Sequence, residues 1–387
     1  MNATVGKQLL DPSLALSFEQ LQLPRDLSRV QLADPALVPA LQSLLGDASC
    51  SADGQVNVIV GSRADQTVLL ARCLSQTVGL PIRLGEKILW EQRLPALRLP
   101  PDAQFGVCSE ADALGLLAYV RAAVAGRMLV LSDLVTDGPL YRAVLNAHQA
   151  GFVLTKNEPD AHLFHRFGDS YDAFFGQRSS KQRNQLRKKE KVFAERFGDD
   201  FAFREYRAED EVAPFLAAAE SINRKTYQFR MFGESVDADA HSVAAGRRAA
   251  AAGYFRSFVL WHGSQPICFI FGHQRADGTF EHRQTGFDPE FRDAAPGIYA
   301  NILLLKRLYA VDRPRVMDFG SGDSDYKRLF SNESLTTASP VLLPHHARFI
   351  LAHRLFEAST ALNDATVEFL ERLGVKDWIK RRMRGAT

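Results

Sequence analysis

The stretch FRSFVLWHGSQPICFIFGHQRADGTFEHRQTGF, residues 255–287, decides the fold of this chain. It contains three strand-like runs, FRSFVLW at 255–261, PICFIFGHQ at 266–274 and TFEHRQTGF at 279–287, separated by the short connections HGSQ and RADG. Runs of this composition predict strands, and connections this short join antiparallel neighbours. We therefore expect an antiparallel meander of three strands.

The segments around the meander carry other patterns. Helical apolar spacing precedes it near 211–230 and 239–252, and a helix over 294–310 and a strand over 315–319 follow it. Two helices, a meander, a helix and a strand together predict a fold of the α/β (α+β) class. Its sheets should be mixed, mostly antiparallel and flanked by helices.

The first part of the chain predicts further α/β structure. Short apolar runs at 56–61, 127–135 and 151–157 indicate strands, and 111–126 and 138–151 have helical spacing. These segments show no evident chemistry. A chain of 387 residues also exceeds one ordinary core, so we expect two domains.

We place the domain boundaries where the sequence character changes. Residues 1–165 should form an N-terminal α/β domain, and residues 166–340 a C-terminal domain that starts with a basic helix over 178–196. Residues 341–387 should form a helical tail, because an amphipathic pattern runs through most of them.

The composition indicates a soluble cytoplasmic protein. Hydrophobic residues make up 46%, charged residues 24%, and the net charge is only +2, so no global field attracts nucleic acid. The N-terminus lacks the pattern of a secretory signal, and no run approaches the length of a membrane span. Widely spaced cysteines predict reduced thiols, and the absence of CxxC and HExxH motifs indicates no metal: Cys50, Cys73, Cys108 and Cys268.

The basic helix over 178–196 carries eight Lys or Arg residues, and Ser179 or Ser180 should cap it. Such a run is usually a solvated face, but it can also bind nucleic acid or line a cleft. We find no nucleic-acid-binding module. We expect most lysines to be solvated, while Arg183 and Arg187, one turn apart, line a cleft for a phosphate or carboxylate.

Pro296 suits the first turn of the helix over 294–310, and Gly297 lets a ligand approach the backbone. We expect the N–H groups of Gly297, Ile298, Tyr299 and Ala300 to be free and to form an anion site. The alternative is an ordinary Pro-Gly helix start.

The segment VMDFGSGDSDYKRLF, residues 316–330, is the most unusual one. Asp318 ends a strand, two glycines permit a tight turn, and Tyr326 and Lys327 begin a new helical turn. Tyr and Lys are plausible proton carriers in a dry pocket. In the alternative interpretation Asp318 only caps the turn and Lys327 is solvated.

Three other classes of enzyme are excluded. The DxGxG turn of S-adenosylmethionine-dependent methyltransferases should be followed by several βα units, yet fewer than 70 residues follow DFGSGD. The remaining protein-kinase motifs are missing, so DFG is not a kinase motif here. No GxSxG motif is present, which argues against a serine hydrolase.

Residues 165–335 resemble the GNAT acyltransferases. More narrowly, they resemble the CelD/BcsL-like group associated with cellulose and exopolysaccharide biosynthesis, which is related to the Fem-type aminoacyl transferases. The first 160 residues fit loosely as the degenerate first half of a tandem GNAT-like chain. The matching segments are SSKQRNQLRKKEK (179–191), INRKTYQFR (222–230), Phe287-Asp288, Pro296-Gly297 and Asp318 to Lys327.

The resemblance implies roles for individual residues. The helix start at Gly297–Ala300 corresponds to the site of the acyl-CoA pyrophosphate, although its Pro-Gly start departs from the usual glycine-rich loop. Tyr326 and Lys327 correspond to a pair that contacts the acyl donor, and Asp288 and Asp318 are candidates for orienting or deprotonating the acceptor. The acceptor would meet four basic residues: Arg183, Arg187, Arg224 and Lys225.

These features predict an N-acyltransferase that uses acetyl-CoA or another acyl-CoA and no metal. Its acceptor would be an amine of a small, sugar or nucleotide-linked molecule, in polysaccharide or cell-envelope biosynthesis. We expect no specific nucleic-acid partner and no transmembrane segment, and association with a membrane surface stays open. Two alternatives remain, a Fem-like transferase that uses aminoacyl-tRNA and a non-catalytic module of a polysaccharide-synthesis complex.

Overall fold

The computed structural model describes residues 16–372 except 33, 85–86, 101–108, 124–125, 227–228 and 230–234. The chain forms two compact units, and it passes between them more than once. The described parts of Met1–Arg72 and Pro159–Ala338 form the first unit. Those of Cys73–Pro101, Cys108–Glu158 and Ser339–Thr387 form the second.

The first unit is built on a large mixed sheet with the strand order β10-β11-β12-β13-β14-β9-β15. Strands β11, β12 and β13 form the antiparallel meander that the sequence predicts, while β13 and β14 are parallel. The bounds are β9 Pro159–Arg166, β10 Ala202–Tyr206, β11 Ser257–His262, β12 Gln265–Gln274, β13 Thr279–Phe287, β14 Val316–Ser321 and β15 Glu333–Ala338.

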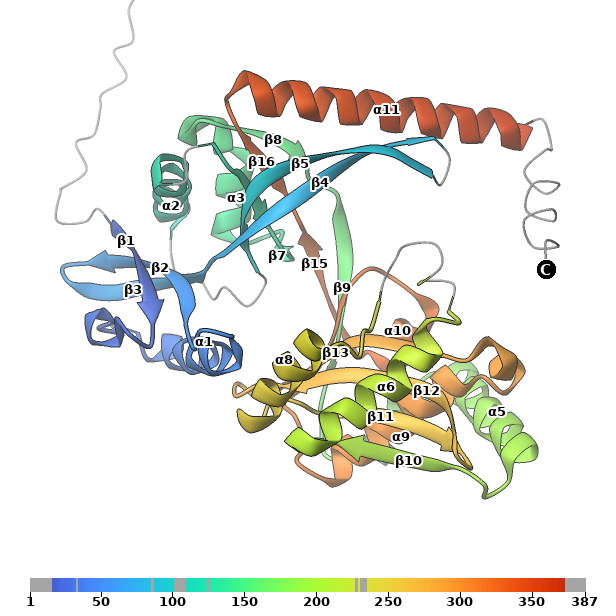
Figure 1. The fold of residues 1–387 in the computed structure, drawn as a ribbon. Coiled ribbons are helices and arrows are strands. Elements are labelled where there is room, and N and C mark those ends of the chain that lie inside the picture. Colours follow the sequence, from blue (N-terminus) through green and yellow to red (C-terminus); the bar gives the residue numbers. More distant parts are fainter. Residues whose placement is uncertain are drawn as a thin grey trace, which may run out of the picture. The chain divides into compact units, whose positions relative to one another are not determined.

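Helices cover both faces of this sheet (Figure 1). Along β11, Phe258 and Leu260 belong to one hydrophobic core and Val259 to another, because successive side chains point to opposite faces. The first core includes helices α5 and α9, and the second includes α6 and α8. The helices of this part are α4 Tyr171–Gln177, α5 Ser180–Phe197, α6 Val212–Asn223, α8 Ala240–Ala251, α9 Pro296–Ala310 and α10 Asp325–Phe330.

The first unit also contains a small antiparallel sheet with the order β1-β2-β3. Helix α1 packs on it and contacts α8. Arg275, in the β12–β13 turn, joins the two parts, because its guanidinium lies 3.3 Å from the carboxylate of Asp47 and bonds to Ser43. The bounds are β1 Ser17–Leu23, α1 Val38–Cys50, β2 Val56–Arg63 and β3 Gln66–Arg72.

The second unit contains a five-stranded sheet with the order β4-β5-β6-β16-β8. A long hairpin of β4 and β5 forms one side, and helix α11 packs against β4. The bounds are β4 Leu74–Leu84, β5 Lys87–Leu99, α2 Glu110–Ala123, β6 Met128–Leu131, β7 Leu134–Val135, α3 Pro139–Leu145, β8 Phe152–Lys156, β16 Val341–Pro344 and α11 Ala347–Arg372.

The expected fold class is confirmed, since mixed, mostly antiparallel sheets are flanked by helices. Two expectations for single segments are wrong. Residues 341–344 form strand β16, which pairs with β6 and β8, instead of belonging to a helical tail. The helix expected near 211–230 already ends at Asn223, and 227–228 and 230 lie outside the described residues.

The expected domain boundaries at 165/166 and 340/341 stay a prediction. Contacts group residues 16–72 with the unit that contains the meander. Each unit is made of several separate stretches of sequence, because the chain enters each unit more than once.

Within the described ranges, no helix is both long enough and apolar enough to span a membrane. A search of the same residues finds no group of three or more His, Cys, Asp or Glu side chains placed to hold a metal ion. Cys73 and Cys268 are buried, Cys50 is half-buried, and Cys108 lies outside the described residues.

Candidate active site

Strands β13 and β14 separate near the middle of the large sheet. They pair only over Thr279–Glu281 and Val316–Asp318, although β13 continues to Phe287 and β14 to Ser321. Helix α9 follows β13 after a short 3-10 helix, and α10 follows β14. Ligands of α/β sheets bind where the carboxyl ends of neighbouring strands diverge, so this is the first place to look for a site.

Asp318 lies at the point where the two strands separate. Its Oδ1 accepts hydrogen bonds from the backbone N–H of Gly320 at 2.7 Å and from His162 Nε2 at 2.6 Å. His162 comes from β9, is buried, and stacks on Phe164 with ring centroids 4.4 Å apart. Asp318 therefore caps its turn and is anchored to a neighbouring strand, so it holds the loop in place.

Lys327 closes the same loop. Its Nζ donates to the carbonyl oxygens of Ser321 at 2.7 Å and Gly320 at 3.3 Å. The interpretation of Lys327 as a freely solvated side chain is therefore wrong. The neighbouring Tyr326 is half-buried, and burial raises the pKa of its phenol to about 12, so the phenol keeps its proton at neutral pH.

His282 is the residue that sequence reasoning missed. It follows Glu281, the last residue of β13 that pairs with β14, and it is 5% exposed. Its ring centroid lies 5.4 Å from that of Phe319 and 6.4 Å from that of Tyr326. Burial is the main reason why the pKa of His282 is lowered to about 4. The charge of Lys327 acts in the same direction, whereas the backbone of His282, the Asn301 side chain and the charge of Asp318 act in the opposite direction. The structure thus gathers three predicted residues around this imidazole. A histidine on a strand beside a predicted site was the only signal in the sequence.

Asp288 and Lys225 form a separate pair at the far end of β13. Asp288 is 2% exposed and accepts bonds from the N–H of Glu290 at 3.1 Å and from Lys225 Nζ at 2.5 Å. Asp288 therefore caps the 3-10 helix before α9. Arg224 is exposed and pairs with Glu220 at 2.7 Å, one turn back along α6.

The start of α9 differs from the expectation of four free amides. The N–H groups of Ile298 and Tyr299 both donate to the carbonyl of Ala295, at 3.1 and 3.2 Å, because the residue before the helix supplies its first acceptor. Among the four, Gly297 keeps an amide for which the described residues provide no observed acceptor. Ala300 is buried, and the Tyr299 ring stacks on Phe193 of α5 at 3.9 Å. Fewer backbone amides than expected are therefore free to bind an anion at this helix start.

The basic helix α5 is capped by Ser179 in a capping box, as predicted. Arg183 donates to the carbonyl oxygens of Gly176 and Arg178 at 3.0 and 2.5 Å, so it holds the end of α4. The guanidinium of Arg187 lies 5.3 Å from the ring of Phe175. Three lysines of the helix are exposed, as expected for a solvated face: Lys181, Lys188 and Lys191.

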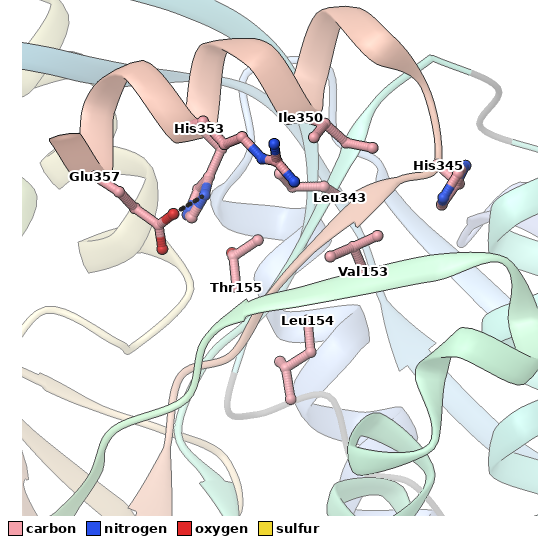
Figure 2. Close-up of a pocket in the computed structure, with 9 residues that line it drawn as sticks. Val153, Leu154, Thr155, Leu343, His345, Ile350, His353 and Glu357 are labelled. Atoms are coloured by element: carbon pink, nitrogen blue, oxygen red, sulfur yellow. Dashed lines mark ion pairs between the residues drawn. The ribbon is translucent and has the colours of Figure 1, made fainter.

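The second unit has a pocket of its own, of about 290 Å³. Figure 2 shows it between β8, β16 and the start of α11, with His345 at one end. His353 Nδ1 lies 3.3 Å from a carboxylate oxygen of Glu357, and Arg354 and Val153 also line it. None of the predicted site residues lies there, so this pocket is separate from the site at β13 and β14.

Comparison with known families identifies one domain within the first unit. A family model described as an acetyltransferase (GNAT) domain matches residues 180–328, which include β13, α9, β14 and the first residues of α10. The chain therefore carries a GNAT domain, and with it the fold of an acyltransferase. Domains of this kind use acyl-CoA. No curated protein sequence matches the chain.

Solved structures with a similar fold are distant in sequence. A conserved protein of unknown function from Bacteroides thetaiotaomicron is 13% identical with a TM-score of 0.50, and the alignment covers 82% of this chain and 96% of that one. The C-terminal domain of a putative lysylphosphatidylglycerol synthetase from Agrobacterium fabrum is 12% identical over 85% and 94% (TM-score 0.48). A tandem GNAT protein of the clavulanic acid pathway is 9% identical over 86% and 99% (TM-score 0.47). Similarity at this level indicates no substrate.

Proposed function

We propose that this protein transfers an acyl group, most simply acetyl, from acyl-CoA to the amine of a small, sugar or nucleotide-linked acceptor. The observation that carries the proposal is the separation of β13 from β14 inside a GNAT domain, with the buried His282 and the half-buried Tyr326 at that point. At the point where β13 and β14 separate, the backbone is fixed, and neutral, partly desolvated side chains can donate and accept protons. Acyl transfer uses both features.

The reaction we propose is direct attack. The amine nitrogen forms a bond to the thioester carbonyl carbon, the C–S bond breaks, and its electron pair leaves with sulfur. Tyr326 supplies a proton to the departing thiolate, because burial keeps its phenol protonated. Backbone N–H groups of the separated strands stabilise the oxyanion. Asp318 and Lys327 act as positioning residues, since both hold the loop that leads to Tyr326.

We propose the start of α9 as the place of the acyl-CoA phosphates, at the predicted residues Gly297–Ala300. The fit is partial, because two of these amides donate to Ala295. The amide of Gly297 and the helix dipole remain for an anion. A Cβ at Gly297 would lie 3.4 Å from the ring of Phe287, so the backbone of this turn packs closely against the end of β13.

We propose that basic residues recognise an acidic or nucleotide-linked acceptor. Among the predicted residues, Arg187 and Arg224 are exposed, whereas Arg183 is engaged with backbone carbonyls and Lys225 with Asp288. Any role of Arg183 or Lys225 therefore requires exchange of these partners. A place in the CelD/BcsL-like group, in cytoplasmic polysaccharide or cell-envelope synthesis, is the finer part of the proposal and rests on the sequence motifs.

Isothermal calorimetry with acetyl-CoA tests donor binding, and mass spectrometry of a panel of primary amines incubated with protein and acetyl-CoA tests transfer. We expect acetyl-CoA to bind and a product heavier by one acetyl group to form. Tyr326→Phe should slow transfer about 10–100-fold without weakening donor binding. Lys191→Ala is the control, because that side chain is 77% exposed and away from the site. Absence of acetyl-CoA binding, together with salt-sensitive binding of aminoacyl-tRNA, would instead support a Fem-like donor.

A further inference from the structure

His282 occupies a special position on β13. It is the first residue beyond the segment that pairs with β14, and its buried side chain contacts aromatic rings from β14 and α10. Its Nε2 is buried and has no hydrogen-bond partner. A buried polar atom without a partner is uncommon in a folded protein, so the burial of this nitrogen needs a physical reason.

The chemistry of this imidazole is defined by its other contacts. A hydrogen bond with the backbone of His282 itself acts to raise the pKa of the ring, and the tautomer protonated at Nδ1 is the one consistent with this bond and with an unpartnered Nε2. A neutral imidazole carries one proton. Because Nδ1 holds it, Nε2 presents a lone pair. The low pKa of His282 agrees with a neutral ring at physiological pH.

Asn301 of α9 presents a second lone pair. Its side chain is 1% exposed, and its Nδ2 donates to the carbonyl of Gly297 at 2.8 Å, which fixes the orientation of the amide. The Oδ1 is therefore turned away from Gly297, and it too is buried without a partner. The Asn301 side chain lies within hydrogen-bonding range of the His282 ring and acts to raise its pKa, although the geometry of the two side chains leaves both Nε2 and Oδ1 without a formed bond.

Two hydrogen-bond acceptors cannot satisfy each other. His282 Nε2 and Asn301 Oδ1 both lack a proton in this arrangement, so a ligand that donates at least two N–H or O–H bonds would satisfy both. A primary amine has two N–H groups and a lone pair. With its two N–H groups bound to Nε2 and Oδ1, the lone pair is left for attack on a thioester.

We propose that His282 and Asn301 form the subsite for the attacking amine, an inference that rests on the acyl transfer proposed above. The two acceptors orient the amine before the reaction. After the C–N bond forms, the nitrogen is positively charged and acidic, and its proton passes to His282 Nε2. The carboxylate of Asp318 favours the imidazolium that results. Sulfur leaves with the C–S electron pair and takes a proton from Tyr326, so the step is balanced.

The tautomer of His282 provides a test that needs no knowledge of the acceptor. NMR of the full chain labelled with ¹⁵N-histidine, with the signals assigned by their loss in His282→Gln, should show a protonated Nδ1 and an unprotonated Nε2. A protonated Nε2 would mean that it donates to Asn301 Oδ1. The two residues would then form a closed structural pair, and the inference would be wrong.

The second test uses ethylamine as the probe, with the acetyl-CoA analogue in which a methylene replaces sulfur. Ethylamine should shift the Nε2 signal of His282 in a saturable manner, and Asn301→Leu should abolish this shift. His165 is an internal control, because it is equally buried but both of its ring nitrogens are partnered, by Phe330 O and the Tyr309 hydroxyl. A change in His165 that equals the change in His282 would contradict specific binding, as would no change in His282.

Kinetics then separate the subsite from the proposed function. With an amine that the wild-type protein acylates, His282→Gln should lower kcat/KM for the amine about 100-fold and leave the KM for acyl-CoA unchanged. His165→Gln should leave both constants within about twofold at a temperature where it is folded. If the analogue does not bind the wild-type protein, the proposed function fails, and titration with ethylamine alone still decides the subsite. If the wild-type protein transfers acyl groups and His282→Gln does so equally well, only the subsite fails.

Discussion

His165 lies wholly inside the first unit, and its replacement by glutamine should remove part of the acid sensitivity of that unit. The side chain is 0% exposed, its Nδ1 donates to Phe330 O at 2.8 Å, and its Nε2 accepts from the Tyr309 hydroxyl at 3.0 Å. Burial lowers its pKa to about 4, and the nearby charge of Arg178 acts in the same direction. The folded protein therefore holds this imidazole neutral at pH 5, where the unfolded chain binds a proton.

The sign and size of the effect follow from linkage. The unfolded state binds more protons between the two pKa values, so acidification favours unfolding in that range. For a histidine with an unfolded pKa of about 6.5 and the folded pKa given above, the destabilisation is about 0.2 kcal/mol at pH 7 and about 2 kcal/mol at pH 5. His165 should thus account for about 1.8 kcal/mol of the stability lost between these two values.

The assay is hydrogen exchange followed by mass spectrometry on peptides of β12, whose core amides report the opening of the first unit. His165→Gln loses hydrogen bonds at every pH, and this constant offset cancels when each protein is compared with itself at pH 7 and pH 5. His282 and His273, whose pKa values burial also lowers, are common to both proteins. If wild type and variant lose the same stability within about 0.5 kcal/mol, His165 is not held neutral and the reasoning is wrong.

Three further predictions concern the sheet and the site. Arg256→Met should destabilise the first unit by about 3–5 kcal/mol in denaturant unfolding, because the buried guanidinium of Arg256 bonds to Glu205 and to two backbone carbonyls. The control is Arg307→Met, which should cost under about 1 kcal/mol, because the Arg307 side chain pairs with the same carboxylate but is 45% exposed. Equal losses of stability in the two variants would refute the argument. Gly297→Glu should weaken acetyl-CoA binding in calorimetry at least 10-fold through charge repulsion, whereas Gly297→Ala should change the affinity less than about threefold. Unchanged binding in Gly297→Glu would mean that the phosphates bind at another place. Lys327→Met should lower the rate of transfer about 10-fold and increase hydrogen exchange of the loop it closes, and a slower rate with an unchanged loop would instead mean that Lys327 takes part in the chemistry.

The meander shows what local pattern predicts well. The runs at 255–261, 266–274 and 279–287 became β11, β12 and β13, because strands joined by so few residues have few alternatives to antiparallel pairing. The basic helix and a cap at Ser179 or Ser180 were predicted for the same reason, and the structure uses Ser179, since capping depends on residues only three positions apart.

The long hairpin of β4 and β5 and the strand β16 were not predicted. Residues 87–99 carry charged side chains such as Glu91 and Arg93, which pair with each other on the surface and obscure the alternation of a strand. Strand β16 is only four residues long and pairs with β6 and β8, which lie more than 180 residues earlier in the chain. Neither feature leaves a strong local signal.

The sequence by itself determined that the chain is an α/β protein with a meander, a basic capped helix and a polar loop after a buried strand. Tertiary structure alone decided which of these residues meet. It joined Asp318 to His162, closed the loop with Lys327, separated Asp288 from this group by pairing it with Lys225, and buried His282 beside Asn301. The reason is physical, because whether a side chain finds a hydrogen-bond partner depends on strands and helices far apart in the chain, and the unpartnered atoms that point to a ligand exist only after packing.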